Sequence, residues 1–163
     1  MNQNKIWDYF QNDSEIADLA FESSTRYNKI ASDIEAGSHV LNIGIGRGGL
    51  EEVLISNGIN VYCLDPNEKS IERVKNKLEL TDRAKVGYSQ SIPFSDQIFD
   101  VVVMTEVLEH LSDEVINQTL REVNRVLRSG GKFIGTVPAD ENLLKQRVVC
   151  PDCGKLFHQW GHL

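Results

Sequence analysis

The chain has 163 residues, 40% of them hydrophobic, which suits one compact domain with a sizeable core. Its net charge of −7 argues against a general electrostatic grip on nucleic acid or on an anionic membrane surface. No apolar run approaches the roughly 20 residues of a membrane span, and the stretch from Met1 to Trp7 lacks the apolar core of a signal peptide. The three cysteines do not make a disulfide framework, so we expect a cytoplasmic protein.

The N-terminal part of the chain is polar with spaced apolar positions. From about Lys5 to Ile34 this spacing is typical of one or two amphipathic helices, which Gly37 ends. Beyond Gly37, apolar runs with strand character alternate with helical patterns. The predicted strands are residues 39–43, 60–64, 84–88, 100–105 and 131–137, and the predicted helices are about 49–57, 68–80 and 112–127. This alternation predicts an α/β fold, a doubly wound parallel sheet with helices on both faces.

A glycine-rich turn follows the first predicted strand. Glycines occupy positions 44, 46, 48 and 49, and Asp65 ends the next apolar strand about twenty residues later. Such a loop lets the backbone approach a ligand closely, and a carboxylate at the second strand's tip can hold the two hydroxyls of a ribose. The pattern predicts an adenosine-type cofactor. Its literal form, Gly44-x-Gly46-x-x-Gly49, also satisfies the nicotinamide dinucleotide fingerprint, so an NAD-dependent oxidoreductase remains an alternative.

Five segments within residues 39–138 carry a pattern known from one family. They are residues 41–48, 61–65, 91–100, 99–111 and 122–131. In this order they resemble the class I S-adenosylmethionine-dependent methyltransferases, of the type 11/12-like kind that acts on small molecules. The resemblance implies a Rossmann-like sheet, S-adenosyl-L-methionine as cofactor, and methyl transfer to an unidentified small-molecule acceptor. A nicotinamide enzyme is not expected to carry the last three segments.

The resemblance also implies which residues bind the cofactor. They are Asn42, Gly44, Gly46, Gly48, Asp65, Ser89, Gln90 and Thr105. The glycines would let the loop pass under the methionine end, and Asp65 would accept hydrogen bonds from both ribose hydroxyls. A backbone N–H of Ser89 or Gln90 would flank the adenine, and Thr105 would lie near the methyl group. Asn42 departs from the family, which usually has an acidic residue at this position to hold the cofactor's ammonium group.

The candidate catalytic residues are Glu106 and His110, which both follow the fourth predicted strand. Methyl transfer mainly requires alignment of acceptor, methyl and sulfur with water excluded. A general base is needed only where the acceptor must lose a proton, and Glu106, Glu109 and His110 are the nearest candidates. A histidine near a helix start more often caps backbone groups or packs.

The C-terminal segment contains Cys150, Cys153, His158 and His162. Cys-x2-Cys is the spacing of a metal knuckle, and two histidines four residues apart project to one side of a helix. Four ligands of these types suit tetrahedral zinc, so we expect a zinc site. The alternatives are a redox-active thiol pair, or side chains that only pack on the domain. The spacing also resembles nucleic-acid-binding zinc knuckles, but the chain has no basic cluster to support that use.

The sequence also allows a second set of metal ligands. Glu106-x-x-Glu109-His110 with a later histidine resembles the ligand set of methyltransferases that act on the terminal 2′-hydroxyl of small RNAs. The same sequence around these residues is common in methyltransferases that bind no metal. An RNA 2′-O-methyltransferase is therefore a minor alternative.

The predicted organisation has three parts: a helical cap (1–38), a Rossmann-like core (39–138) and a Cys/His segment (139–163). The family usually has seven strands, whereas five are visible, so we expect the last two to be absent. The fifth strand would then be an exposed edge, which favours a homodimer through that edge. Asn42 and the missing strands also allow a catalytically inactive cofactor-binding or scaffold module. We expect no nucleic-acid or membrane partner.

Overall fold

The computed structural model describes residues 23–162 of the chain. Most of the predicted N-terminal helical cap, residues 1–22, lies outside this range. The helices are α3 (Ser24–Ser32), α4 (Gly49–Ser56), α5 (Glu68–Leu78) and α6 (Asp113–Val126), with short 3-10 helices η1 (Thr81–Arg83) and η2 (Leu108–His110). The strands are β1 (His39–Ile43), β2 (Asn60–Asp65), β3 (Ala84–Val86), β4 (Phe99–Thr105), β5 (Leu127–Thr136), β6 (Arg147–Val149) and β7 (Leu156–His158).

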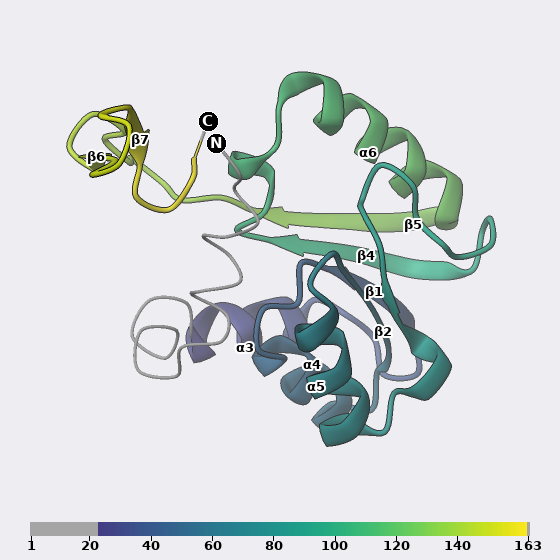
Figure 1. The fold of residues 1–163 in the computed structure, drawn as a ribbon. Helices are drawn as coiled ribbons and strands as arrows, with labels where there is room; N and C mark the ends of the chain where they lie inside the picture. Colours follow the sequence, from purple (N-terminus) through teal and green to yellow (C-terminus); the bar gives the residue numbers. More distant parts are fainter. Residues whose placement is uncertain (1–22, 163) are drawn as a thin grey trace.

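Five strands form one sheet in the order β3-β2-β1-β4-β5, and every neighbouring pair is parallel (Figure 1). This arrangement confirms the predicted α/β, Rossmann-like fold. The fifth strand begins earlier than predicted, at Leu127, which pairs with Phe99. The pairing then shifts between Phe99 and Val101, and Gly130 has a φ of +78° within the irregular stretch.

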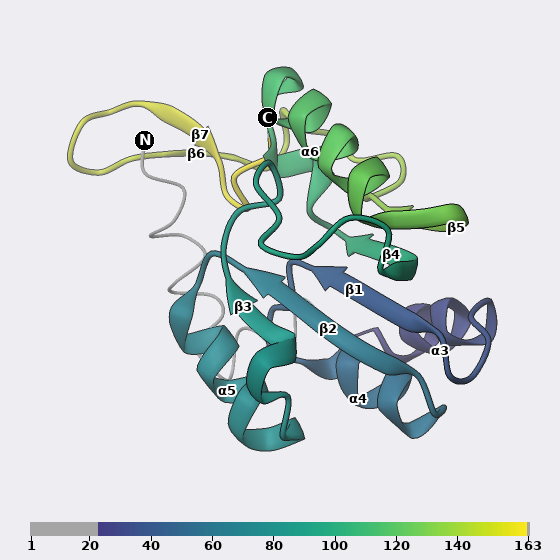
Figure 2. The same cartoon turned by 90° about the vertical axis from the view of Figure 1, so that its right-hand side faces the viewer.

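The central strands β1, β2 and β4 are largely buried, and their alternate residues supply two separate cores. On β1, Val40 joins the core under α3, α4 and α5, whereas Leu41 joins the core under α6. Figures 1 and 2 show this three-layer arrangement, with α6 on the opposite side of the sheet from the other helices. Within residues 23–162, no helix is long and apolar enough to cross a membrane.

The connection from β3 to β4 helps to cover the α6 face without forming a helix. One side chain of α6 clamps it: the Arg125 guanidinium donates hydrogen bonds to the backbone oxygens of Ile92 (2.9 Å) and Phe94 (3.0 Å) and to the Asp96 carboxylate (2.6 Å). Glu122 accepts from Arg125 and also from the Ile92 N–H (2.8 Å). This pairing explains physically why residues 91–100 and 122–131 occur together in the sequence pattern.

A polar cluster lies buried beneath α4. Asn42 of β1 donates to the Glu51 carboxyl group at 2.6 Å, and the Cys63 thiol lies 3.9 Å from the same oxygen. The Glu51 side chain is fully buried between the helix and the sheet. Burial raises the pKa of Glu51 to about 7, although the hydrogen bond from Asn42 opposes this shift. At neutral pH, Glu51 is therefore close to its titration point.

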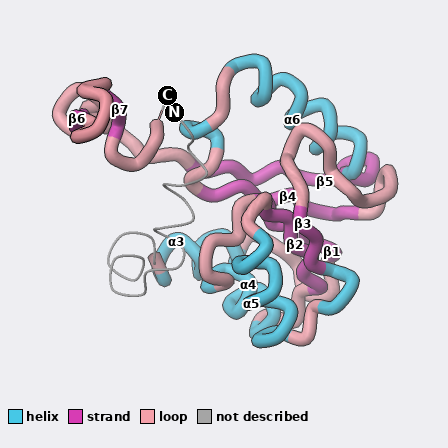
Figure 3. The backbone as a smooth tube through the Cα atoms, viewed as in Figure 1, coloured by secondary structure: helices cyan, strands magenta, loops and turns pink. Residues whose placement is uncertain are grey.

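Beyond β5 the chain leaves the main sheet. Strands β6 and β7 form a separate antiparallel hairpin that projects from the body of the domain (Figure 3). They do not extend the five-stranded sheet, and among residues 23–162 only β4 pairs with β5. The homodimer through this edge stays a prediction.

We predict that Arg125→Ala lowers the free energy of unfolding by about 2 kcal/mol, because buried backbone oxygens lose charge-assisted hydrogen bonds. Urea denaturation followed by circular dichroism measures this change. Arg128→Ala is the matched control: Arg128 forms a surface ion pair with Asp100, so its removal should cost only about 0–1 kcal/mol. Equal losses in the two variants would contradict the clamp.

We predict that Glu51→Gln makes stability less dependent on pH. Because the pKa of Glu51 is raised in the folded protein, the folded state retains this proton longer than the unfolded chain does. The free energy of unfolding of the wild type should therefore decrease as the pH rises from about 4.5 to about 7. This group alone should contribute a decrease of about 3 kcal/mol. Urea titrations across this range should show a flatter curve for Glu51→Gln, while the exposed neighbour variant Glu52→Gln keeps the wild-type slope.

Candidate cofactor and acceptor site

The candidate site lies where the carboxyl ends of β1 and β4 meet. The chain leaves β1 towards β2 on one side, whereas β4 pairs with β1 on the other. Open parallel sheets bind ligands in the crevice at such a switch point. The glycine-rich loop, residues 44–48, follows β1 here, and Glu106 follows β4.

The glycine-rich loop requires glycine for two different reasons. Gly44 and Gly48 have φ values of +81° and +90°, and a Cβ there would lie 2.4 Å from Val107 Cγ2 and 2.8 Å from Val74 Cγ1 respectively. Gly46 also has a positive φ of +52°, but a Cβ at this position would meet nothing within 4 Å. Thus the outer residues pack against the protein, while Gly46 borders open space that a ligand could occupy.

Asp65 links the glycine-rich loop to β2. Its carboxylate accepts hydrogen bonds from the backbone N–H of Ile45 (3.0 Å) and of Asn67 (2.8 Å), and the residue is only 2% exposed. Burial raises the pKa of Asp65 to about 6, and the backbone donors oppose this shift. Because a carboxylate has about four acceptor positions, capacity remains for further donors such as the hydroxyls of a ribose.

The segment after β3 lies beside Asp65, because the Gly87 N–H donates to the Asp65 backbone oxygen at 3.1 Å. Ser89 is buried, and its hydroxyl hydrogen-bonds to Thr119 of α6 at 2.7 Å. Gln90 is half-buried. The Ser89 hydroxyl is therefore engaged with α6, and a contact with adenine is left to the backbone of this segment.

Asn42 lies one strand residue before the loop, but its side chain points to the α4 side and bonds to Glu51. Among the predicted cofactor residues, Asn42 therefore differs, because its side-chain amide forms a hydrogen bond inside the core. Sequence reasoning missed Glu51, although a signal was present. Glu51 lies three residues before Leu54 on the buried stripe of α4, where a carboxylate is out of place.

Thr105 and Glu106 end β4 at the mouth of the site. Glu106 has a φ of +54°, which strains a residue other than glycine and is typical of functional sites. Its conformation is fixed from both ends: its N–H donates to the Thr136 backbone oxygen (3.0 Å), and its carboxylate accepts from the Thr136 hydroxyl (2.8 Å). Arg26 of α3 lies 3.6 Å from the same carboxylate.

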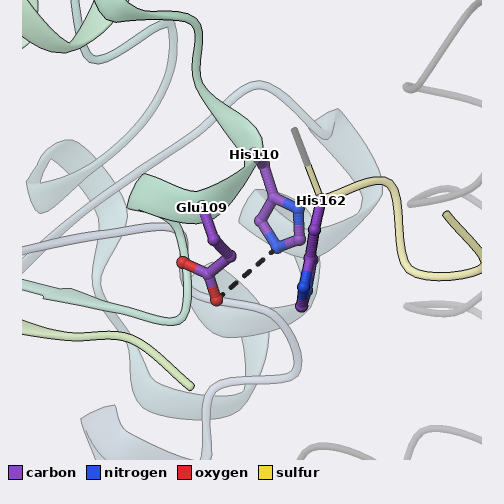
Figure 4. A group of neighbouring side chains, drawn as sticks. All are labelled: Glu109, His110 and His162. Atoms are coloured by element: carbon purple, nitrogen blue, oxygen red, sulfur yellow. Dashed lines mark ion pairs between the residues drawn. The ribbon is translucent and has the colours of Figure 1, made fainter. Parts of the chain in front are cut away.

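Glu109 and His110 follow in η2, and the His110 Nε2 lies 3.9 Å from a Glu109 carboxyl oxygen (Figure 4). Burial raises the pKa of Glu109 to about 7, and the nearby carboxylates of Glu106 and Glu141 act in the same direction. Burial, followed by the charge of His162, lowers the pKa of His110 to about 4. At neutral pH the His110 imidazole is therefore uncharged.

The predicted Cys2His2 ligands fall into two separate pairs. Cys150 and Cys153 lie in the turn between β6 and β7, whereas His158 lies at the other end of the hairpin, opposite Arg147. His158 and His162 stack with ring centres 4.4 Å apart. Among the described residues, no group of three metal-ligating atoms within 4.8 Å combines a cysteine with these histidines. The structure does not assemble the four-ligand site, and bound zinc stays a prediction.

Comparison with known proteins assigns the family. Residues 41–135 match the model of a methyltransferase domain. The sarcosine/dimethylglycine N-methyltransferase of Halorhodospira halochloris is 30% identical over 153 residues, 88% of this chain and 53% of that protein. The protein of the same name from Aphanothece halophytica is 27% identical over 85% of this chain and 52% of its own length. The chain thus spans about half the length of these curated relatives.

Among solved structures, the TehB-like SAM-dependent methyltransferase from Corynebacterium glutamicum superimposes with a TM-score of 0.66. Its identity is 21%, over 82% of this chain and 73% of that one, so this likeness concerns the fold. The sequence model covers more than half of the chain, including the glycine-rich loop, Asp65 and the end of β4. The chain belongs to the methyltransferase-domain family.

Proposed function

We propose that this chain binds S-adenosyl-L-methionine at the glycine-rich loop and transfers its methyl group to a small-molecule acceptor. The main observation in support is the Asp65 carboxylate, which is buried at the tip of β2 and accepts a hydrogen bond from the Ile45 N–H. It lies beside the open space at Gly46. This geometry offers a narrow backbone turn for the amino-acid end and a carboxylate for the ribose. The family membership supports the same assignment.

The bound cofactor would supply an already activated methyl group on sulfur, so the chain's own residues bind, orient and exclude water. The positive φ angles of Gly44 and Gly48 set the course of the loop. Asp65 would hold the ribose hydroxyls. The backbone after β3 would flank the adenine. Thr105 and Glu106 would border the space where methyl donor and acceptor meet.

On the acceptor side, Glu109 is better suited than His110 to accept a proton. A general base works best when its pKa lies near the working pH. The pKa of Glu109 is about 7, whereas that of His110 is about 4, so His110 binds a proton only weakly at neutral pH. We assign His110 to orientation of the site and Glu109 to proton transfer, where the acceptor requires one.

A small-molecule acceptor agrees with the composition and with the relatives. The net charge of −7 disfavours a nucleic-acid substrate. Two relatives are named for N-methylation of sarcosine and dimethylglycine, which places their acceptors among small amines. We extend this class, a small amine, to the present chain as the first acceptor to test.

Calorimetric titration with S-adenosylhomocysteine tests the cofactor assignment. We expect micromolar binding, and Asp65→Asn should weaken it about 10- to 100-fold, because a carboxylate that accepts from hydroxyl groups is replaced by a neutral amide. Asp82→Asn is the matched control: this exposed carboxylate precedes the first residue of β3, whereas the site lies at the carboxyl ends of the strands, and it should leave the affinity unchanged.

NAD serves as the ligand control in the same titrations. Binding of NAD in preference to S-adenosylhomocysteine would favour the oxidoreductase alternative and overturn the proposal. Weak binding that Asp65→Asn does not alter would place the ligand elsewhere. After cofactor binding is established, transfer of a labelled methyl group to sarcosine and dimethylglycine tests the acceptor class.

A further inference from the structure

Five side chains that can bind a metal meet beside η2. Glu109 and His110 come from η2, His158 from β7, and Glu141 and His162 from the irregular parts of the C-terminal segment. Ligand atoms of Glu109, His110 and His162 lie within 4.8 Å of one another, and so do those of Glu141, His158 and His162. His162 belongs to both groups, so the C-terminal segment reaches back to the end of β4 here.

The Glu109 carboxyl group is mostly buried and receives no hydrogen bond from another described residue. Its side chain is 11% exposed, and neither of its oxygens accepts a hydrogen bond from the described residues. Arg26 lies 3.6 Å from the Glu106 carboxylate, and its charge lowers the pKa of Glu109 less than burial raises it. A buried carboxylate in this state is costly unless a cation or a proton accompanies it.

His162 is oriented as metal-binding histidines usually are. Its Nδ1 lies 2.5 Å from a Glu141 oxygen, which fixes this nitrogen as the one that carries the proton. The second ring nitrogen, Nε2, then has a lone pair for a cation. The His110 ring lies beside it, with ring centres 4.7 Å apart and the two ring planes tilted by 60°.

His158 is a poorer ligand than His110, although it lies close by. Its Nδ1 accepts the backbone N–H groups of Trp160 and His162, both at 3.4 Å. In the neutral ring the proton then occupies Nε2, which lies 3.5 Å from Glu141. A protonated nitrogen cannot bind a metal, so His158 packs against His162 and shares Glu141.

We propose that Glu109, His110 and His162 bind a divalent transition-metal cation of the zinc class, with Glu141 as the carboxylate that orients His162. Two imidazoles and one carboxylate are the ligand types that such cations accept. Ligand atoms around tetrahedral zinc lie roughly 3.3 Å apart, given bonds of about 2.0–2.1 Å. The His110–Glu109 distance of 3.9 Å needs only a small contraction to reach this value.

The proposed site has consequences for the neighbouring methyl-transfer site. Three protein ligands leave a fourth position open to water or to an acceptor group. Glu109 bound to a cation cannot also accept a proton, so the proton-transfer role of Glu109 applies to the metal-free protein. Since Glu109 and His110 follow Glu106 closely, this position lies on the acceptor side of β4. The cation would also fix the C-terminal segment, through His162, against the core of the domain.

Zinc titration of the metal-free protein tests the proposal. The full chain is stripped with a chelator and titrated calorimetrically with Zn²⁺ at pH 7.5. We expect one equivalent to bind, with affinity lowered at least about 100-fold in Glu109→Gln and in His110→Gln. Glu141→Gln should lower it about 10- to 100-fold, because only the orienting carboxylate is lost. Circular dichroism of each metal-free variant checks that its fold is retained.

Two control variants and a cobalt substitution separate this site from its neighbours. The double variant Cys150→Ser, Cys153→Ser and the variant His158→Gln should each bind zinc within about threefold of wild type. Co²⁺ in place of zinc should give visible absorption without the near-ultraviolet charge-transfer bands of thiolate ligands.

Several outcomes would overturn the proposal. Zinc binding lost in the cysteine variant but kept in Glu109→Gln would instead support the Cys2His2 site. Loss in His158→Gln with His110→Gln unaffected would move the cation to the neighbouring group. Absence of binding by the wild type would exclude a metal at this position. Titration of the metal-free protein with S-adenosylhomocysteine reports on the cofactor site separately, so failure of one proposal does not obscure the other.

Discussion

The hydrogen bond from the Ile45 N–H to the Asp65 carboxylate holds the two halves of the proposed cofactor site together. It joins the loop after β1 to the tip of β2, in a place too buried for water to substitute. An ionised carboxylate is tolerated there only because backbone groups donate to it, and these donors oppose the rise of its pKa. The open space at Gly46 and the position of the segment after β3 are arranged around this contact. A ligand with two further hydrogen-bond donors, such as the hydroxyls of a ribose, would complete the hydrogen bonding of the Asp65 carboxylate.

The acceptor side depends on a different constraint, the strained backbone of Glu106. Thr136 of β5 holds this residue by its N–H and by its carboxylate, so the end of β4 and the end of β5 are fixed together. The turn that follows places Glu109 and His110 against the C-terminal segment, where His162 meets them. Residues far apart in the sequence thereby share one buried polar region, whose raised and lowered pKa values have a common cause in burial.

The sequence predicted those features that depend on local pattern. Alternating strands and helices predicted the parallel sheet, and Gly44, Gly46 and Gly48 predicted a glycine-rich loop after the first strand, where all three have a positive φ. Contacts between distant side chains could not be predicted in the same way. The Cys2His2 arrangement assumed that nearness in sequence means nearness in space, but the hairpin separates its two pairs. The partner of His162 is instead Glu141, which no spacing rule connects with it.

The most direct test of the account is a map of the ligand on the backbone. Amide signals of the isotope-labelled protein are followed by NMR as S-adenosylhomocysteine is added. The account predicts that the largest shifts occur at Ile45 to Gly48, at Asp65 to Asn67 and at Ser89 and Gln90, with smaller ones after β4. Shifts confined to the β6–β7 hairpin, or the absence of shifts at the glycine-rich loop, would contradict it.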